Sequence, residues 1–99
     1  MDEKRYRESR LCRLLGNPIV YQLVVFLEAE GPTTPSKLAK SIGRHVSTIS
    51  IHLAKLRGAD VVRYDTSGKT VRYWLKHKNE MKGLLKMLER VVDASAKVE

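Results

Sequence analysis

Residues 35–58 read PSKLAKSIGRHVSTISIHLAKLRG, and this stretch decides the fold. In its first part Leu38, Ala39 and Ile42 lie on one face of a short helix. Gly43 then marks a turn. After a polar segment, the apolar residues resume at helical spacing with Ile49, Leu53 and Leu56. Two short helices joined by a tight turn that contains Gly predict a helix-turn-helix.

The spacing of apolar residues changes from helical to alternating directly after this stretch, and Gly58 is expected to cap the helix that precedes the change. Residues 61–64 and 70–75 are expected to form two strands. The turn between them, residues 65–69, contains Gly68, which supplies a positive φ. A hairpin that directly follows the second helix of a helix-turn-helix is a wing.

Three further helices flank this unit. The first spans residues 3–15, and Gly16 and Asn17 are suited to end it as C-cap residues. Pro18 then opens a nearly all-apolar helix, which we expect to be the central buried one. The last helix spans about residues 79–96. The predicted class is therefore mainly α with a small β-hairpin wing, a winged helix-turn-helix in the order α-α-α-α-β-β-α.

Length and composition bound the class of protein. Ninety-nine residues are expected to form one domain, residues 1–99. No apolar run is long enough for a transmembrane helix, and the N-terminal MDEKRYRESR lacks the apolar segment of a secretory signal, so we expect a cytoplasmic protein with no membrane partner. The formal net charge of +8 indicates a polyanionic partner, nucleic acid first, although a basic protein without such a partner is the alternative.

The helix after the Gly43 turn carries the pattern S-x-x-S-x-H-L-x-x-L over residues 47–56. Together with residues 36–39 and the wing at 65–75, it resembles the core of the ArsR-type winged helix-turn-helix repressors. Residues 14–27 resemble a further segment of that family. The resemblance implies a homodimer built from the first and last helices, with two recognition helices facing one palindromic operator.

These patterns predict a sequence-specific transcription regulator, most often a repressor, that binds double-stranded DNA as a homodimer. Two alternatives stay open: an architectural DNA-binding protein without operator specificity, and a winged-helix module for protein interaction. The sequence has no Gly-rich phosphate loop and no carboxylate paired with His, so neither an enzyme nor a cofactor is expected. The effector is unknown at this stage.

A recognition helix presents its N-terminal residues to base edges and its flanks to phosphates. The residues expected to contact DNA there are Arg44, His45, Ser47, Thr48, Ile51 and Lys55. Those expected in the wing are Arg63, Lys69 and Arg72. Ser47 is equally suited to cap the helix, and the cations of the helix end and the wing have the alternative of being ordinary solvated charges. The apolar Ile51 is suited to contact a thymine methyl group.

The first and last helices carry more apolar side chains than so short a chain is expected to bury alone. The expected dimer-interface residues are Leu11, Leu14, Leu15, Met81, Leu84, Leu85, Leu88, Val91 and Val92. An exposed apolar surface of that extent usually marks a protein interface, and cyclic dimers are the commonest oligomers. The alternative is that the last helix folds back onto its own core.

The ArsR-type resemblance raises metal sensing as a function, but the sequence does not predict it. Such sensors typically carry a Cys pair in the third helix or Asp, His and Glu pairs on the last one, whereas residues 34–37 contain no cysteine and only His77 lies near the last helix. The single Cys12 is a redox-switch candidate or, more simply, a small buried apolar residue. His52, beside Leu53, is expected to be a packing residue with satisfied hydrogen bonds.

Overall fold

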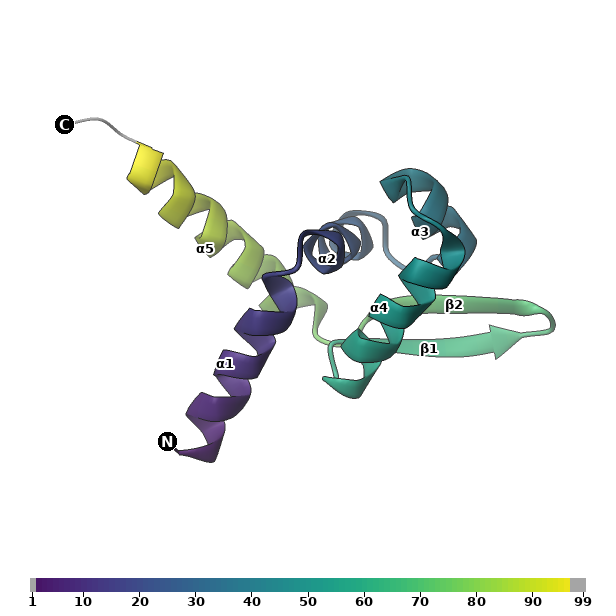
Figure 1. The fold of residues 1–99 in the computed structure, drawn as a ribbon, viewed down its shortest axis with the longest axis horizontal. Helices are drawn as coiled ribbons and strands as arrows, with labels where there is room; N and C mark the ends of the chain where they lie inside the picture. The colour runs from purple at the N-terminus through teal and green to yellow at the C-terminus, as the bar shows by residue number, and fades with distance from the viewer. Residues whose placement is uncertain (1, 97–99) are drawn as a thin grey trace.

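The computed structural model describes residues 2–96. Its elements are α1 (Glu3–Leu15), α2 (Pro18–Glu30), α3 (Pro35–Ile42), α4 (Val46–Gly58), β1 (Val62–Ser67), β2 (Thr70–Leu75) and α5 (Lys78–Ala96). This order, with the two strands paired as one antiparallel hairpin, confirms the predicted winged helix-turn-helix class. Figure 1 shows α2 near the centre, the wing projecting on one side, and α1 and α5 diverging on the other.

The connection between α1 and α2 is short because Asn17 caps the second helix. Its side-chain oxygen accepts hydrogen bonds from the backbone N–H groups of Ile19 at 2.9 Å and Val20 at 3.2 Å. Gly16 takes the C-cap position of α1, as expected, but the prediction that Asn17 also ends α1 is wrong, because it begins α2. The two helices meet at 94°, which directs α1 away from the body of the fold.

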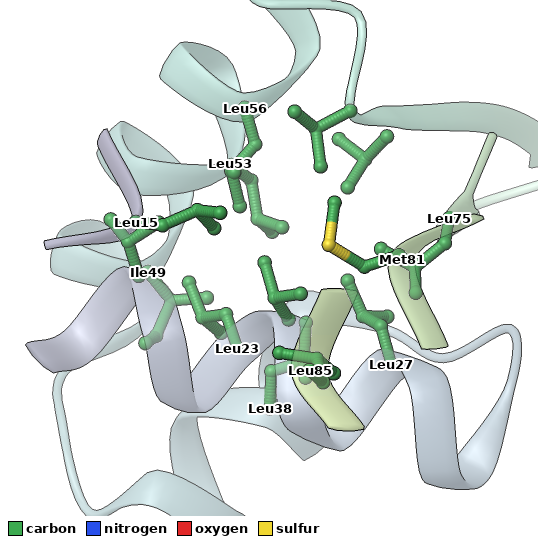
Figure 2. Packing of buried hydrophobic residues seen from close by; sticks show 14 of the residues in the cluster. Leu15, Leu23, Leu27, Leu38, Ile49, Leu53, Leu56, Leu75, Met81 and Leu85 are labelled. Atoms are coloured by element: carbon green, nitrogen blue, oxygen red, sulfur yellow. The ribbon is translucent and has the colours of Figure 1, made fainter. Parts of the chain in front are cut away.

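The hydrophobic core is built around α2, as its apolar sequence predicts. The buried residues of α2 are Val20, Leu23, Val24 and Leu27. The side chains that pack around them are Leu15, Leu38, Ala39, Ile49, Leu53, Leu56, Val61, Val62, Leu75, Met81 and Leu85. Figure 2 shows side chains from these elements pointing into one common interior. The position of α4 relative to the rest of the chain is therefore fixed by apolar packing.

Strand β1 is longer than the sequence predicts. The expected five-residue turn over residues 65–69 is wrong, because β1 continues to Ser67 and leaves only Gly68 and Lys69 between the strands. Gly68 supplies the positive φ, +62°, that was expected of it. The longer ladder carries the hairpin loop further from the core and makes the wing a narrow projection (Figure 1).

The base of the wing is fastened to the connection between α2 and α3. The N–H of Tyr73 donates to the carbonyl of Thr33 at 2.8 Å, and the N–H of Thr33 donates back to the carbonyl of Tyr73 at 3.0 Å. Thr33 is buried, so this bridge lies inside the fold and is shielded from competing water. The wing and the helix-turn-helix are thereby held in one fixed arrangement.

Helix α4 gives way to the wing through Asp60. Gly58 was expected to cap the helix, but it is the last helical residue, Ala59 takes the C-cap position, and Asp60 has the left-handed φ of +64°. Asp adopts this conformation more readily than most residues. The Asp60 carboxylate accepts a hydrogen bond of 2.6 Å from the ammonium of Lys76, and this bond holds the pKa of Asp60 below its ordinary value.

Over residues 2–96 no single helix is long and apolar enough to cross a membrane. Taken together, α1 and α2 have sufficient length and apolar composition, but they are bent by 94° at their junction. The apolar character of this pair belongs to α2, whose buried side chains form the centre of the core.

Replacing Asp60 by Asn tests the ion pair at the base of the wing. Asn also tolerates a left-handed φ, so Asp60→Asn removes the charge that Lys76 binds without adding backbone strain. We expect a lower melting temperature at neutral pH. The lowered pKa means that the charge stabilises the fold in full above the ordinary carboxyl pKa of about 3.9. This stabilisation is lost as the pH falls through the folded-state pKa.

Melting temperatures followed by circular dichroism across the acid range should therefore converge for the wild type and Asp60→Asn. Asp93→Asn is the matched control, because Asp93 is exposed on α5 and has no ion pair within the described residues. A difference for Asp60→Asn that widens toward low pH would contradict the stabilising role assigned to the carboxylate.

Candidate nucleic-acid interface

Helix α4 has one face in the core and one face in solvent. Ile49, Leu53 and Leu56 are completely buried. The residues on the opposite side are exposed, and we call Val46, Ser47, Ser50, Ile51 and Ala54 the outward face of α4. The fold thus holds the helix from one side and leaves its opposite side exposed to solvent.

The angle between α3 and α4 is set by the turn at Gly43. Gly43 has a φ of +76°, the left-handed conformation that L-residues other than Asn and Asp rarely adopt. The carbonyl of Ala39 accepts hydrogen bonds from the N–H groups of both Gly43 at 2.9 Å and Arg44 at 3.0 Å. This closes α3 tightly and sends the chain directly into α4, which is the helix-turn-helix that the sequence predicts.

The beginning of α4 borders a shallow hollow of about 470 Å³. Its lining residues are Ala39, Lys40, Gly43, Arg44, His45 and Thr48. His45 is the N-cap residue and its side chain makes no capping hydrogen bond, so the first N–H groups of the helix are left without a side-chain partner. Such groups, beside cationic side chains, attract anionic oxygens.

The beginning of α4 differs from the sequence prediction in two respects. The alternative that Ser47 caps the helix is wrong, because the helix begins at Val46 and the cap position belongs to His45. Lys40 was not predicted, yet it lines the same hollow as Arg44. Its signal in the sequence is its place in the last turn of α3, three residues before Gly43.

The basic residues of the wing do not form one cluster. Arg63 and Arg72 lie on the same face of the hairpin, but Asp65 stands directly opposite Arg72 in the register. The guanidinium of Arg63 lies 4.0 Å from the carboxylate of Asp60, at the base of the wing. Lys69 lies in the loop, and roughly 13 Å of strand separates the loop from Arg63. Lys69 is therefore the cation that the wing extends furthest.

An aromatic stack within the wing contacts a cation from the end of α4. The rings of Tyr64 and Tyr73 face each other across the hairpin with centroids 5.5 Å apart, and the guanidinium of Arg57 lies 4.9 Å from the centroid of Tyr64. A cation over an aromatic face is attracted by the ring quadrupole. Arg57 is thus directed toward the wing, and the sequence alone gives no sign of this pairing.

His52 is half-buried on α4, in keeping with a packing residue. The expectation that its hydrogen bonds are satisfied is wrong, because its buried Nδ1 has no hydrogen-bond partner within the described part of the chain. The imidazole therefore contributes to packing at the cost of one unpaired nitrogen.

The apolar residues predicted for a dimer interface divide into two groups. Leu15, Met81 and Leu85 are each only 7% exposed and belong to the core of the chain itself, so they offer little surface. Leu11 and Leu14 are half-buried against that core. The rest of α5 presents an exposed apolar stripe, which we call the α5 apolar face: Leu84, Met87, Leu88, Val91 and Val92.

Helix α5 has features of both alternatives that the sequence leaves open, a helix packed on its own core and a helix with an exposed apolar surface. Its first turns fold back onto the core of their own chain, and its later turns project away from the body (Figure 1). Met87 was missed, although it lies at helical spacing between Leu84 and Val91. Tyr6 on α1, 54% exposed, was also missed as an apolar surface residue.

The remaining sequence hypotheses concern a metal site and Cys12. Across residues 2–96 no group of three or more His, Cys, Asp or Glu side chains is arranged to hold a metal ion. Cys12 is exposed on α1, so the interpretation of it as a buried apolar residue is wrong for the single chain.

Known proteins are similar to this chain in both sequence and fold. Residues 17–64 match the bacterial regulatory protein arsR family. The HTH-type transcriptional regulator CmtR of Mycobacterium tuberculosis is 34% identical over 89 residues, which cover 87% of this chain and 75% of CmtR.

Two solved structures show the same fold at lower identity. Rv0081 of Mycobacterium tuberculosis superposes with a TM-score of 0.81 at 21% identity, covering 98% of this chain and 100% of its own. The homodimeric winged helix-turn-helix DNA-binding domain Mb0332 of Mycobacterium bovis superposes with a TM-score of 0.77 at 18% identity, covering 94% and 88%.

Two glycines beside α4 should respond to Ala in opposite directions. The φ of +76° at Gly43 is strained for Ala, so Gly43→Ala should lower the free energy of unfolding by about 1 kcal/mol. Gly58 is helical and a Cβ there meets nothing within 4 Å, so Gly58→Ala should raise it by about 0.5 kcal/mol. Urea unfolding followed by circular dichroism measures both values. Equal destabilisation by the two substitutions would contradict the different conformations assigned to these glycines.

Proposed function

Because this chain belongs to the ArsR family of bacterial regulatory proteins, we propose that it is a sequence-specific transcription regulator that binds double-stranded DNA as a homodimer. A two-fold dimer places two α4 helices on one duplex, so the proposed operator is palindromic. We propose repression as its mode of action and the cytoplasm as its location. We assign it no enzymatic activity, in keeping with its relatives, which are transcriptional regulators.

The observation that carries this proposal is the division of α4 into a completely buried side and a free outward face. The major groove of DNA admits one α-helix, whose N-terminal residues meet the base edges. In that position Ser47, Thr48 and Ile51 lie nearest the bases. The buried side, anchored by the core, keeps the helix from turning as it docks.

The phosphates on either side of the groove have basic partners in the same arrangement. At the beginning of α4 these are Lys40, Arg44 and His45, and at its end Lys55. In the wing they are Lys69, which lies in the hairpin loop, and Arg72, which lies on β2 three residues further along the chain. We leave Arg63 out of the proposed contacts because its guanidinium forms an ion pair with the carboxylate of Asp60 at the base of the wing.

The proposed dimer uses the α5 apolar face together with Leu11 and Leu14 of α1. Contiguous apolar surface on a helix that projects from the body is costly to leave in water. A second copy supplies an identical surface, which suits a two-fold interface. In this proposal the chain acts as one domain, with α1 and α5 as its dimerisation elements.

Sequence-specific binding is tested by comparing two DNA probes at near-physiological salt. We expect the protein to bind the DNA upstream of its own gene about a thousandfold more tightly than random DNA of equal length. Fluorescence anisotropy with labelled duplexes measures both affinities. Equal affinity for the two probes would contradict a sequence-specific regulator.

The salt dependence of binding separates the proposed wing contacts from their neighbours. Lys69→Ala should reduce the slope of log affinity against log salt concentration by about 2, since each dimer would lose two phosphate contacts. Arg63→Ala is the matched control and should leave the slope unchanged, because Arg63 forms an ion pair with Asp60 and is not among the proposed phosphate contacts. The same reduction for both variants would contradict the assignment.

The dimer is tested by placing a charge on the α5 apolar face. Wild-type protein should sediment at twice the chain mass of 11.3 kDa, and Leu88→Glu should sediment as a monomer with an unchanged circular dichroism spectrum. Leu88 is 36% exposed and lies outside the core, so the substitution spares the fold. Val25→Glu, at an exposed apolar position on α2, is the control. A monomeric wild type, or equal dissociation by both variants, would contradict the proposed interface.

A further inference from the structure

The outward face of α4 lacks the side chains that read bases by paired hydrogen bonds. Val46 is 46% exposed and Ile51 is 59% exposed, and the other three members are small: Ser47, Ser50 and Ala54. Arg or Lys pairs with guanine and Asn or Gln with adenine through two hydrogen bonds. No residue of these types occurs between Val46 and Ala54.

The nearest basic residues lie at the two ends of this face. Arg44 and Lys40 border the hollow at the beginning of α4, and Lys55 follows Ala54. Arg57 lies 4.9 Å from the ring centroid of Tyr64, which directs it toward the wing and away from the middle of the helix. The centre of the recognition helix is therefore apolar, and its surroundings are cationic.

This combination selects one kind of partner. The cationic surroundings favour a polyanion, and they disfavour a second copy of the same positively charged surface. Within the major groove the apolar group on a base edge is the C5-methyl of thymine. Exposed branched aliphatic side chains fit that group, and the hydroxyls of Ser47 and Ser50 can bond to either an acceptor or a donor on neighbouring bases.

We propose that the outward face of α4 reads thymine methyl groups, so that the operator half-sites are rich in A·T pairs beneath Ile51 and Val46. This inference rests on the proposed function and adds the class of sequence that the regulator recognises. Ile51 is the main determinant, because it is the most exposed large apolar side chain of the helix and lies beside the hydroxyl-bearing Ser47 and Ser50.

The size of the effect follows from the area that one methyl group buries. Removing one buried methyl group weakens binding by about fourfold. A dimer places two copies of Ile51 on the operator, so loss of one methyl contact at each copy weakens binding by about fifteenfold. Such a loss lies well within the range that a direct binding measurement resolves.

The experiment begins with the duplex that the wild-type protein selects from a random-sequence library. We expect half-sites rich in A·T pairs. The selected duplex is then prepared twice, with thymine and with uracil, which pairs with adenine in the same way but lacks the C5-methyl group. Wild-type protein should bind the uracil duplex about tenfold more weakly or worse. The uracil penalty of Ile51→Ser should be about tenfold smaller than that of the wild type, because only Val46 is then left to contact a methyl group.

Lys55→Ala is the matched control. It should weaken binding to both duplexes by the same factor, because a phosphate contact does not depend on the base. Ile51→Ser keeps the core intact, since Ile51 points away from it, and an unchanged melting temperature verifies this.

The possible outcomes distinguish failure of the methyl-reading inference from failure of the proposed function. Selection of G·C-rich half-sites, equal binding of the thymine and uracil duplexes, or a uracil penalty as large in Ile51→Ser as in the wild type would overturn the methyl-reading inference and leave the proposed function intact. Failure of the library to yield any enriched sequence would overturn the proposed function, and the inference with it.

Discussion

The packing of α4 against the core is the interaction on which the rest of this structure depends. Ile49, Leu53 and Leu56 are completely buried in the core that is built around α2, and each contributes about 1.5–3 kcal/mol of burial free energy. The Gly43 turn fixes where α4 begins, and Asp60 fixes where it gives way to the wing. The Thr33–Tyr73 bridge ties the wing to the connection that precedes α3. Helix, turn and wing therefore move as one body, which is the requirement for docking a preformed surface on DNA.

Charge is distributed on this body in a way that complements its shape. The chain has a net charge of +8, yet α2 carries no basic side chain. Cations lie at both ends of α4 and at the wing loop. At the base of the wing the carboxylate of Asp60 reduces the positive charge, because it forms ion pairs with Lys76 and Arg63. Cationic side chains thus border the recognition helix at both ends, while its centre is left to apolar and hydroxyl side chains. Affinity from phosphates and selectivity from bases are assigned to different residues.

The sequence predicts the element order, the Gly43 turn and the central place of α2, because each follows from local periodicity or from a residue with a strict backbone preference. It fails where tertiary contacts decide. Gly58 is the more obvious helix terminator, yet Asp60 takes the left-handed position, since Lys76 binds its carboxylate from the far side of the hairpin. Met81 and Leu85 continue the same stripe as Leu88 and Val92, and only the packing of α5 on its own chain separates core from surface. The stack of Arg57 on Tyr64 joins residues that each look like ordinary exposed side chains in sequence.

The central claim is that the outward face of α4 and the wing loop form one DNA-contacting surface, supported from behind by the core. Amide chemical-shift mapping of the ¹⁵N-labelled protein, titrated with the duplex it selects, tests this claim most directly. We expect the largest shifts over residues 44–55 and 68–72, with core amides of α2 changing little. Shifts concentrated on α2 or on the exposed half of α5, with α4 unaffected, would contradict it.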